Sequence, residues 1–167
     1  DVLTSARGFY ITLPGKNKKY LQHYNDKRPE YKKFIELLKE GENILIRGIP
    51  DVGKTRLVYE GLKSLKGHYV FSLQMIDIFH VDRIKISEKF ASGNKKVIWF
   101  IDDFHVDVND VLSRIFEKLV SQLESLTVIA TVKKDKIIIE KSELIKYLKK
   151  LEILPWTDKE AEDFVDE

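Results

Sequence analysis

The chain has 167 residues, no cysteine, 29 basic residues against 27 acidic ones, and 43% hydrophobic residues. This length suits a single domain that buries roughly 70% of the surface that its unfolded chain would expose. The near balance of charge and the ordinary apolar content argue against a disordered chain and against a strongly basic nucleic-acid tail. The absence of cysteine excludes disulfides, zinc–cysteine sites, iron–sulfur clusters and thiol nucleophiles.

Membrane and secretion signals are absent from the sequence. The longest uncharged apolar run, residues 97–101, is far shorter than the ~20 residues that span a bilayer, and the N-terminus lacks a signal-peptide pattern. We therefore expect a cytoplasmic protein with no membrane partner. The chain begins without methionine and ends inside an apparent helix, so we expect it to be a piece of a longer protein.

Segments with helical spacing of apolar residues alternate with short apolar runs along the chain. Parallel strands need crossover connections of this kind, with helices on both faces of the sheet. The predicted fold class is α/β: a mainly parallel sheet of about five strands in a three-layer αβα arrangement. In chain order we expect a helix at 29–40, a strand at 44–46, a helix at 56–66, a strand at 69–73, a helix at 76–90, a strand at 97–101, a helix at 108–123, a strand at 126–131, a helix at 142–150, a strand at 151–154 and a helix from 157.

Basic residues are concentrated near the N-terminus. Residues 16–33 carry seven basic side chains against two acidic ones, with tyrosines among them. Such interleaving is typical of nucleic-acid or nucleotide binding. A solvated lysine face whose tyrosines pack inward is the favoured interpretation, because the net charge of the whole chain is only +2.

A phosphate-binding pattern, G-x-x-x-x-G-K-[ST], lies between the strand at 44–46 and the helix that follows it. In this pattern, backbone N–H groups surround phosphate oxygens, the lysine neutralises phosphate charge during binding and catalysis, and the threonine hydroxyl can bind Mg²⁺. A glycine turn with a solvated lysine is the weaker alternative. The segment predicts a P-loop NTPase whose nucleotide-binding residues are Gly48, Ile49, Pro50, Asp51, Val52, Gly53, Lys54, Thr55 and Arg56.

Two carboxylates, Asp102 and Asp103, follow the apolar strand at 97–101. A phosphate loop needs an acidic partner for its metal ion, so we expect Asp102 to orient Mg²⁺ together with Thr55. Asp103 is the candidate catalytic base that polarises an attacking water. Both acids could instead cap the next helix, but the P-loop upstream favours the metal site.

A third group near the phosphates is expected at the end of the strand at 126–131. Lys133 follows this strand and could sense the γ-phosphate. Lys133, Lys134 and Lys136 are equally natural as a solvated loop, and the sequence leaves both interpretations open.

Three segments carry a resemblance to a known family: Arg28-Pro-Glu-Tyr-Lys-Lys-Phe34, the stretch from Ile44 to Leu57, and Phe100-Ile-Asp-Asp-Phe-His105. Together they resemble the nucleotide-binding domain of STAND ATPases, the signal-transduction ATPases with numerous domains, which are related to AAA-plus and archaeal ATPases. The resemblance implies a switch that binds ATP or ADP with Mg²⁺ and oligomerises in its ATP form. It also implies that Arg28 and Pro29 lie near the adenine. Asp51 departs from the family, which commonly has glycine at this position.

We divide the chain into a basic, aromatic lead-in at 1–27, a P-loop nucleotide-binding domain at 28–156, and the start of a truncated helical lid at 157–167. The expected function is a Mg·ATP-binding, slowly hydrolysing switch module of a larger regulatory ATPase, weak or inactive as an isolated fragment. Its expected partners are nucleotide, other domains of the same chain and an ATP-dependent homo-oligomer. Two alternatives stay open: an AAA-plus-like motor or loader acting on nucleic acid, which is not favoured, and a non-catalytic nucleotide-binding scaffold.

Overall fold

The computed structural model describes residues 28–63, 65, 68–72, 96–104, 110–134 and 142–158. The lead-in at 1–27 and the predicted helix at 76–90 lie outside these residues, as does the lid segment beyond residue 158. Within the described residues, no helix is long and apolar enough to cross a membrane.

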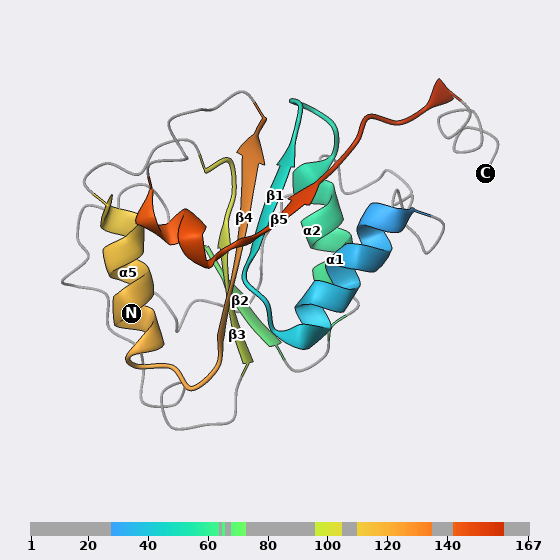
Figure 1. Cartoon of the computed structure of the whole chain (residues 1–167). Helices are drawn as coiled ribbons and strands as arrows, with labels where there is room; N and C mark the ends of the chain where they lie inside the picture. The colour runs from blue at the N-terminus through green and yellow to red at the C-terminus, as the bar shows by residue number, and fades with distance from the viewer. Residues whose placement is uncertain are drawn as a thin grey trace, which may run out of the picture.

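The described strands form one sheet of five parallel strands in the order β2-β3-β4-β1-β5 (Figure 1). This arrangement confirms the predicted α/β class and the parallel sheet. The elements in chain order are α1 (Pro29–Glu40), β1 (Ile44–Gly48), α2 (Lys54–Lys63), β2 (His68–Phe71), β3 (Lys96–Ile101), α5 (Val111–Val120), β4 (Leu126–Lys133), η4 (Glu143–Tyr147) and β5 (Lys149–Glu152).

Alternate side chains of the strands enter two separate cores, one on each face of the sheet. On one face, α1 and α2 pack over residues such as Ile46 and Phe100. On the other face, α5 and η4 pack over residues such as Trp99 and Val128. Figure 1 shows the sheet between these two layers. Strands β1, β3 and β4 are apolar on both faces because both faces are covered, as in other parallel sheets.

Helix α1 begins and ends where the sequence predicts. Pro29 occupies its first turn, where the missing N–H leaves no helical hydrogen bond unmade. Gly41 ends the helix with φ 75°; its N–H donates to the carbonyl of Leu38, and the N–H of Glu42 donates to the carbonyl of Leu37. Glycine reaches this left-handed conformation without a steric penalty, so the chain can turn sharply into β1.

Helices α1 and α2 cross at close range over one face of the sheet. A Cβ at Gly61 of α2 would lie 2.4 Å from the ring of Phe34, which is fully buried. Only a residue without a side chain allows this ring to rest against the backbone of α2. The contact fixes how closely α1 lies over α2.

The prediction of a helix throughout 142–150 is wrong. The structure has a short 3-10 helix at Glu143–Tyr147, and β5 occupies Lys149–Glu152. One turn suffices to bury Leu144 beside α5. The N–H of the first β5 residue donates to the carbonyl of Asn43, and parallel pairing with β1 follows. Pairing with the edge of β1 therefore outweighs the local helical pattern.

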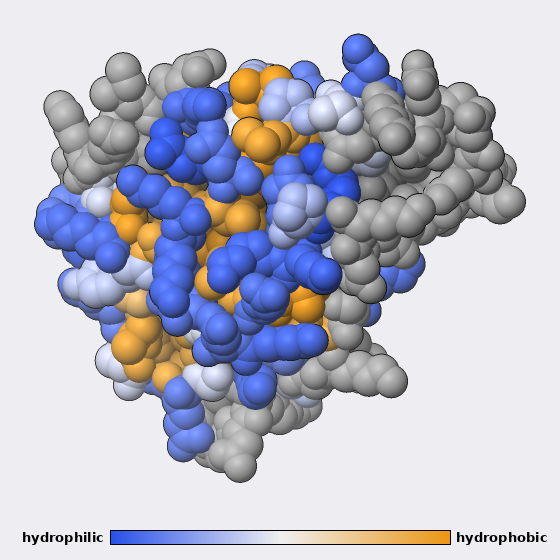
Figure 2. All heavy atoms as spheres, turned by 45° about the vertical axis from the view of Figure 1, so that its right-hand side comes forward, coloured by the Kyte–Doolittle hydropathy of each residue, from blue (hydrophilic) through white to orange (hydrophobic). Residues whose placement is uncertain are grey.

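The side of the molecule that carries α1 and β5 is mostly hydrophilic in Figure 2, with hydrophobic atoms visible between the charged side chains. Exposed ion pairs also link segments that are distant in the sequence, including Lys149 with Glu42 and Lys134 with Glu152. Such exposed pairs stabilise a fold by about 0–1 kcal/mol each. The stability of the domain therefore rests mainly on the two cores.

Candidate nucleotide-binding site

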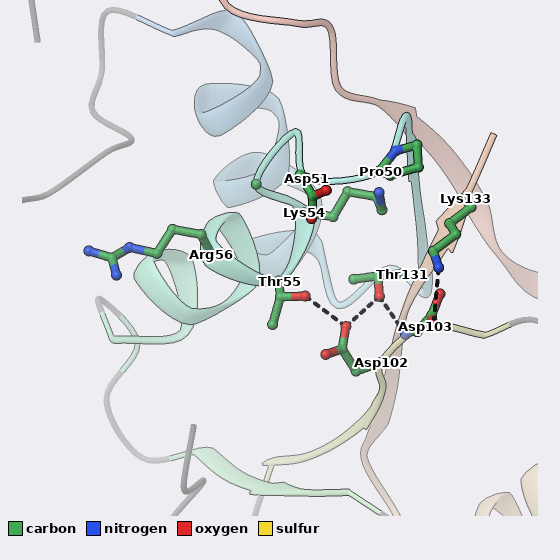
Figure 3. Close-up of a pocket in the computed structure, with 10 residues that line it drawn as sticks. Pro50, Asp51, Lys54, Thr55, Arg56, Asp102, Asp103, Thr131 and Lys133 are labelled. Atoms are coloured by element: carbon green, nitrogen blue, oxygen red, sulfur yellow. Dashed lines mark hydrogen bonds and ion pairs between the residues drawn. The ribbon is translucent and has the colours of Figure 1, made fainter. Parts of the chain in front are cut away.

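The carboxyl ends of β1, β3 and β4 meet at one edge of the sheet, where they enclose a cavity of about 450 Å³ with the loop that leads into α2 (Figure 3). Open parallel sheets bind ligands at this edge. The volume also falls within the range of small-molecule sites. The cavity is lined by Pro50, Asp51, Gly53, Lys54, Thr55, Arg56, Asp102, Asp103, Thr131 and Lys133.

The P-loop has two residues in the left-handed region, Asp51 with φ 59° and Gly53 with φ 93°. The first is a conformation that aspartate tolerates and glycine adopts freely. Gly48, at the start of the loop, is closely packed, because a Cβ there would lie 2.8 Å from the Val52 side chain and 3.0 Å from the carbonyl oxygen of Ile153. Val52 is itself buried in the core that contains Ile153, so it is a packing residue of the loop.

The Lys54 ammonium group is held by the loop itself. Its Nζ donates to the carbonyl oxygens of Gly48 at 3.1 Å and Ile49 at 2.7 Å. Partial burial lowers the pKa of Lys54 below its ordinary 10.5; Asp103 acts in the opposite direction, and Lys133 adds to the lowering. A phosphate in the cavity would offer this ammonium a charged partner in place of two neutral carbonyls.

Asp102 accepts hydrogen bonds from two hydroxyl groups on different elements. Thr55 Oγ1, on the first turn of α2, donates to Asp102 Oδ1 at 2.9 Å, and Thr131 Oγ1, on β4, donates to the same oxygen at 2.6 Å (Figure 3). The structure thus brings together the two residues that the sequence assigns to the metal ion. It adds Thr131 as a third member of the group.

Asp103 has a backbone conformation unlike that of its neighbour Asp102. Its φ is 51°, and its N–H donates to Thr131 Oγ1 at 2.8 Å. Its carboxylate is about half exposed and lies 3.7 Å from Lys133 Nζ. The two residues that the sequence proposes for catalysis and γ-phosphate sensing therefore face each other across the cavity edge.

Arg56 follows Thr55 but directs its guanidinium group away from the two aspartates (Figure 3). Its Nε donates to Glu60 at 2.6 Å, one turn along α2, and the Glu60 side chain is almost fully buried. Arg56 lines the cavity at the start of α2, but its guanidinium group pairs with Glu60, away from Asp102 and Asp103.

Arg28 and Pro29 do not line this cavity. Arg28 is buried at the start of α1, where it donates to Glu30 at 3.1 Å and to the carbonyl oxygen of Leu154 at 3.4 Å. Its guanidinium carbon also lies 4.6 Å from the ring centre of Trp156. We call these contacts the Arg28 clamp, because they join the start of α1 to the segment after β5. The predicted adenine contact at Arg28 and Pro29 stays a prediction.

The residues at the cavity fit a hydrated Mg²⁺ ion. Mg²⁺ prefers oxygen ligands and keeps several waters, with one or two carboxylates and substrate phosphates near it. The Thr55 hydroxyl and the Asp102 carboxylate supply such oxygens side by side. A group of three or more histidine, cysteine, aspartate or glutamate side chains able to hold a metal by themselves is absent from the described residues.

Thr131 has no separate role among the residues predicted from the sequence. It is 1% exposed near the carboxyl end of the apolar strand β4, next to β1 and β3. A single hydroxyl at the carboxyl end of a buried strand is a usable signal, because buried polar groups must find hydrogen-bond partners. The partners themselves depend on strand order, which the sequence does not state.

The fold is also found in solved structures. It is similar to Hsp104 in a closed state with casein, with a TM-score of 0.60 and 18% identity over 82% of this chain and 29% of that chain. The chain has a P-loop NTPase fold. The fold is similar as well to the Thermotoga maritima RuvB branch migration motor, with a TM-score of 0.53 and 19% identity over 81% of this chain and 48% of that chain.

A further similar structure is Aeropyrum pernix ORC1 in complex with DNA, with a TM-score of 0.56 and 13% identity over 92% of this chain and 51% of that chain. The chain thus spans about half or less of the length of these neighbours. No protein-family model and no curated protein matches the sequence.

Proposed function

We propose that this chain is the Mg·ATP- and Mg·ADP-binding module of a larger regulatory ATPase related to the STAND and AAA-plus proteins. The observation that carries the proposal is the hydrogen bond between Thr55 and Asp102, which joins the P-loop to the acidic end of β3. A phosphate-bound Mg²⁺ needs oxygen neighbours, and a hydroxyl side by side with a carboxylate supports this role. Lys54 lies in the same cavity and supplies the positive charge.

Each cavity residue has a distinct role in this proposal. Backbone N–H groups of the P-loop and the start of α2 bind phosphate oxygens, and Lys54 neutralises their charge. Thr55 and Asp102 would hold the metal ion and its water shell, and the ion would neutralise charge on the phosphates. Asp103 orients water and accepts its proton, and Lys133 contacts the terminal phosphate. We expect slow turnover, because Asp103 and Lys133 are about half exposed, which leaves water around the γ-phosphate.

Titration calorimetry with Mg·ATP tests the proposal. Lys54→Ala should weaken binding by about tenfold or more, as expected for the loss of a charge-assisted hydrogen bond to phosphate. Lys63→Ala, in the last turn of the same helix, is the matched control and should bind like the wild type. Equal affinity in the wild type and Lys54→Ala, or no binding by the wild type, would reject the proposal.

A second candidate function is a motor or loader ATPase that acts on nucleic acid. Several solved structures of similar fold are named for work on DNA: two Pif1 helicases at forked DNA, RuvB at a Holliday junction and ORC1 bound to DNA. The basic residues at 16–33 favour the same class. DNA-stimulated turnover that declines steeply with salt would support it. Turnover that ignores DNA at low salt would support the regulatory switch.

A further inference from the structure

One hydroxyl group lies between the two acids of the candidate site. Thr131 Oγ1 is 2.6 Å from Asp102 Oδ1 and 2.8 Å from the backbone nitrogen of Asp103. The carbonyl oxygen of the same threonine accepts the N–H of Phe104 at 2.7 Å. A single residue of β4 therefore contacts three consecutive residues of the turn that ends β3.

The direction of both hydroxyl bonds follows from the chemistry of the partners. A backbone N–H can only donate, so Thr131 Oγ1 accepts from Asp103. An ionised carboxylate can only accept, so the single hydroxyl hydrogen of Thr131 goes to Asp102. This hydrogen is then committed, and Thr131 has none left to donate to a phosphate. The Thr131 hydroxyl is therefore arranged to hold Asp102 and Asp103, and it is not arranged to donate to a phosphate.

Thr131 is itself held firmly. It is 1% exposed, and β4 pairs with β1 on one side and with β3 on the other. Threonine is branched at Cβ, which restricts rotation about its first side-chain bond. Asp102 and Asp103 are exposed by contrast, so their positions depend on what they bond to.

We propose that Thr131 is a positioning residue that sets the metal-binding oxygen of Asp102 and the left-handed turn at Asp103 at the same time. Its donation fixes Asp102 Oδ1 beside the Thr55 hydroxyl, and its acceptance of the Asp103 N–H stabilises a φ of 51° that few residues adopt. The proposal rests on the proposed function in one respect, namely that Asp102 serves a nucleotide-bound Mg²⁺.

Three variants separate the hydroxyl from the shape of the side chain. Thr131→Val removes the hydroxyl but keeps the branched shape in the core, and Thr131→Ser keeps the hydroxyl as a rescue. Thr127→Val is the matched control, because Thr127 lies on the same strand but bonds weakly to the carbonyl oxygen of Gly41, at 3.4 Å. Melting curves of all variants report any general loss of stability.

The first measurement needs no nucleotide. Hydrogen exchange of the Asp103 amide, followed by NMR, should be about tenfold faster or more in Thr131→Val than in the wild type, because the amide loses its acceptor. Thr131→Ser and Thr127→Val should exchange at about the wild-type rate. An Asp103 amide that exchanges equally slowly in Thr131→Val would overturn the proposal.

The second measurement is the ratio of ATP affinity with Mg²⁺ to ATP affinity in a chelator. Thr131→Val should lower this ratio by about tenfold, while affinity in the chelator stays within about twofold of the wild type. Thr131→Ser should restore the ratio. A wild-type ratio in Thr131→Val, or an equal loss with and without Mg²⁺, would overturn the proposal. A wild type that binds no nucleotide would instead reject the proposed function, and amide exchange would still decide whether Thr131 holds the turn.

Discussion

The ammonium group of Lys133 lies 3.7 Å from the carboxylate of Asp103, and both side chains are about half exposed at the mouth of the cavity. The contact joins the end of β4 to the turn after β3 on the side opposite the Thr55–Asp102 hydrogen bond (Figure 3). An exposed pair of this kind contributes about 0–1 kcal/mol. Lys133 can therefore leave Asp103 for a phosphate at small energetic cost.

Lys133→Gln should weaken ATP binding by about three- to tenfold and ADP binding by less, because in the proposed function Lys133 contacts the terminal phosphate. The matched control is Lys134→Gln. Lys134 is the next residue, pairs with Glu152 at 2.6 Å and does not line the cavity. Affinities of both variants for both nucleotides, measured by calorimetry, check the prediction. An equal loss for ATP and ADP would remove the sensing role from Lys133.

Replacement by asparagine should have different effects at the two aspartates: loss of Mg²⁺-dependent ATP affinity at Asp102 and loss of turnover at Asp103. Asp102→Asn should reduce the Mg²⁺-dependent part of ATP affinity by about tenfold, because two hydroxyls bond to that carboxylate and the proposed function gives it to Mg²⁺ as well. Asp103→Asn should leave binding within about twofold and abolish turnover in a full-length protein that hydrolyses ATP. Asparagine tolerates a positive φ as aspartate does, so the change tests charge without adding strain.

The control for Asp103→Asn is Asp110→Asn. Asp110 also has a left-handed backbone, with φ 53°, but precedes α5 and does not line the cavity. Its variant should match the wild type in both binding and turnover. Unchanged turnover in Asp103→Asn would place the general base elsewhere.

Asp51 puts a negative charge into the loop that, in the proposed function, binds phosphates. It lines the cavity, and its charge acts to raise the pKa of Lys54. Asp51→Gly should tighten nucleotide binding by about two- to tenfold, more for ATP than for ADP and more at low salt. The φ of 59° at this residue means that glycine also relieves backbone strain.

Asp51→Asn separates charge from backbone conformation, because asparagine keeps the left-handed tolerance and loses only the charge. If the charge of Asp51 determines the effect, Asp51→Asn and Asp51→Gly should give the same gain in ATP affinity, and the gain should shrink in high salt. A gain confined to Asp51→Gly would assign the effect to loop geometry. Weaker binding in both variants would mean that the carboxylate supports the loop.

The lowered pKa of Lys54 predicts a pH dependence of binding. Burial favours the neutral amine in the free protein, whereas bound phosphate favours the ammonium form. Binding therefore takes up a proton at alkaline pH, and affinity should fall as pH rises from below 10.5, by at most about tenfold per pH unit. In Lys54→Arg, position 54 stays protonated, so any variant that still binds should lose less affinity over this range. Parallel pH profiles for the two proteins would contradict the assignment.

The sequence predicts the strands and the P-loop well because each depends on local patterns. Apolar runs mark β1, β3 and β4, and Pro29 and Gly41 mark the ends of α1. The spacing of the two glycines, lysine and threonine identifies the loop without any knowledge of its neighbours. The placement of Asp102 beside Thr55 could be expected as well. Asp102 follows β3 and Thr55 follows β1, and the carboxyl ends of parallel strands lie at the same edge of a sheet.

Contacts that depend on strand order were not predictable from those patterns. Thr131 reaches both aspartates only because β4 lies between β3 and β1. The boundary at β5 shows the same limitation, because residues 149–150 follow a helical pattern yet pair with β1. Arg28 carries a nucleotide-binding prediction by resemblance, but its described contacts are with Glu30, Leu154 and Trp156. Long-range packing, which no local pattern encodes, decides the contacts of Thr131 and the boundary at β5, whereas the adenine contact of Arg28 stays a prediction.

The close approach of Gly61 to Phe34 has a mechanical consequence for the site. Helix α2 starts at the P-loop, and α1 starts at the Arg28 clamp, so their crossing acts as a fixed spacer between these two places. A methyl group at position 61 would clash with the Phe34 ring and push α1 away from α2. The clamp on the segment after β5 would then move relative to the P-loop, although position 61 does not line the nucleotide cavity.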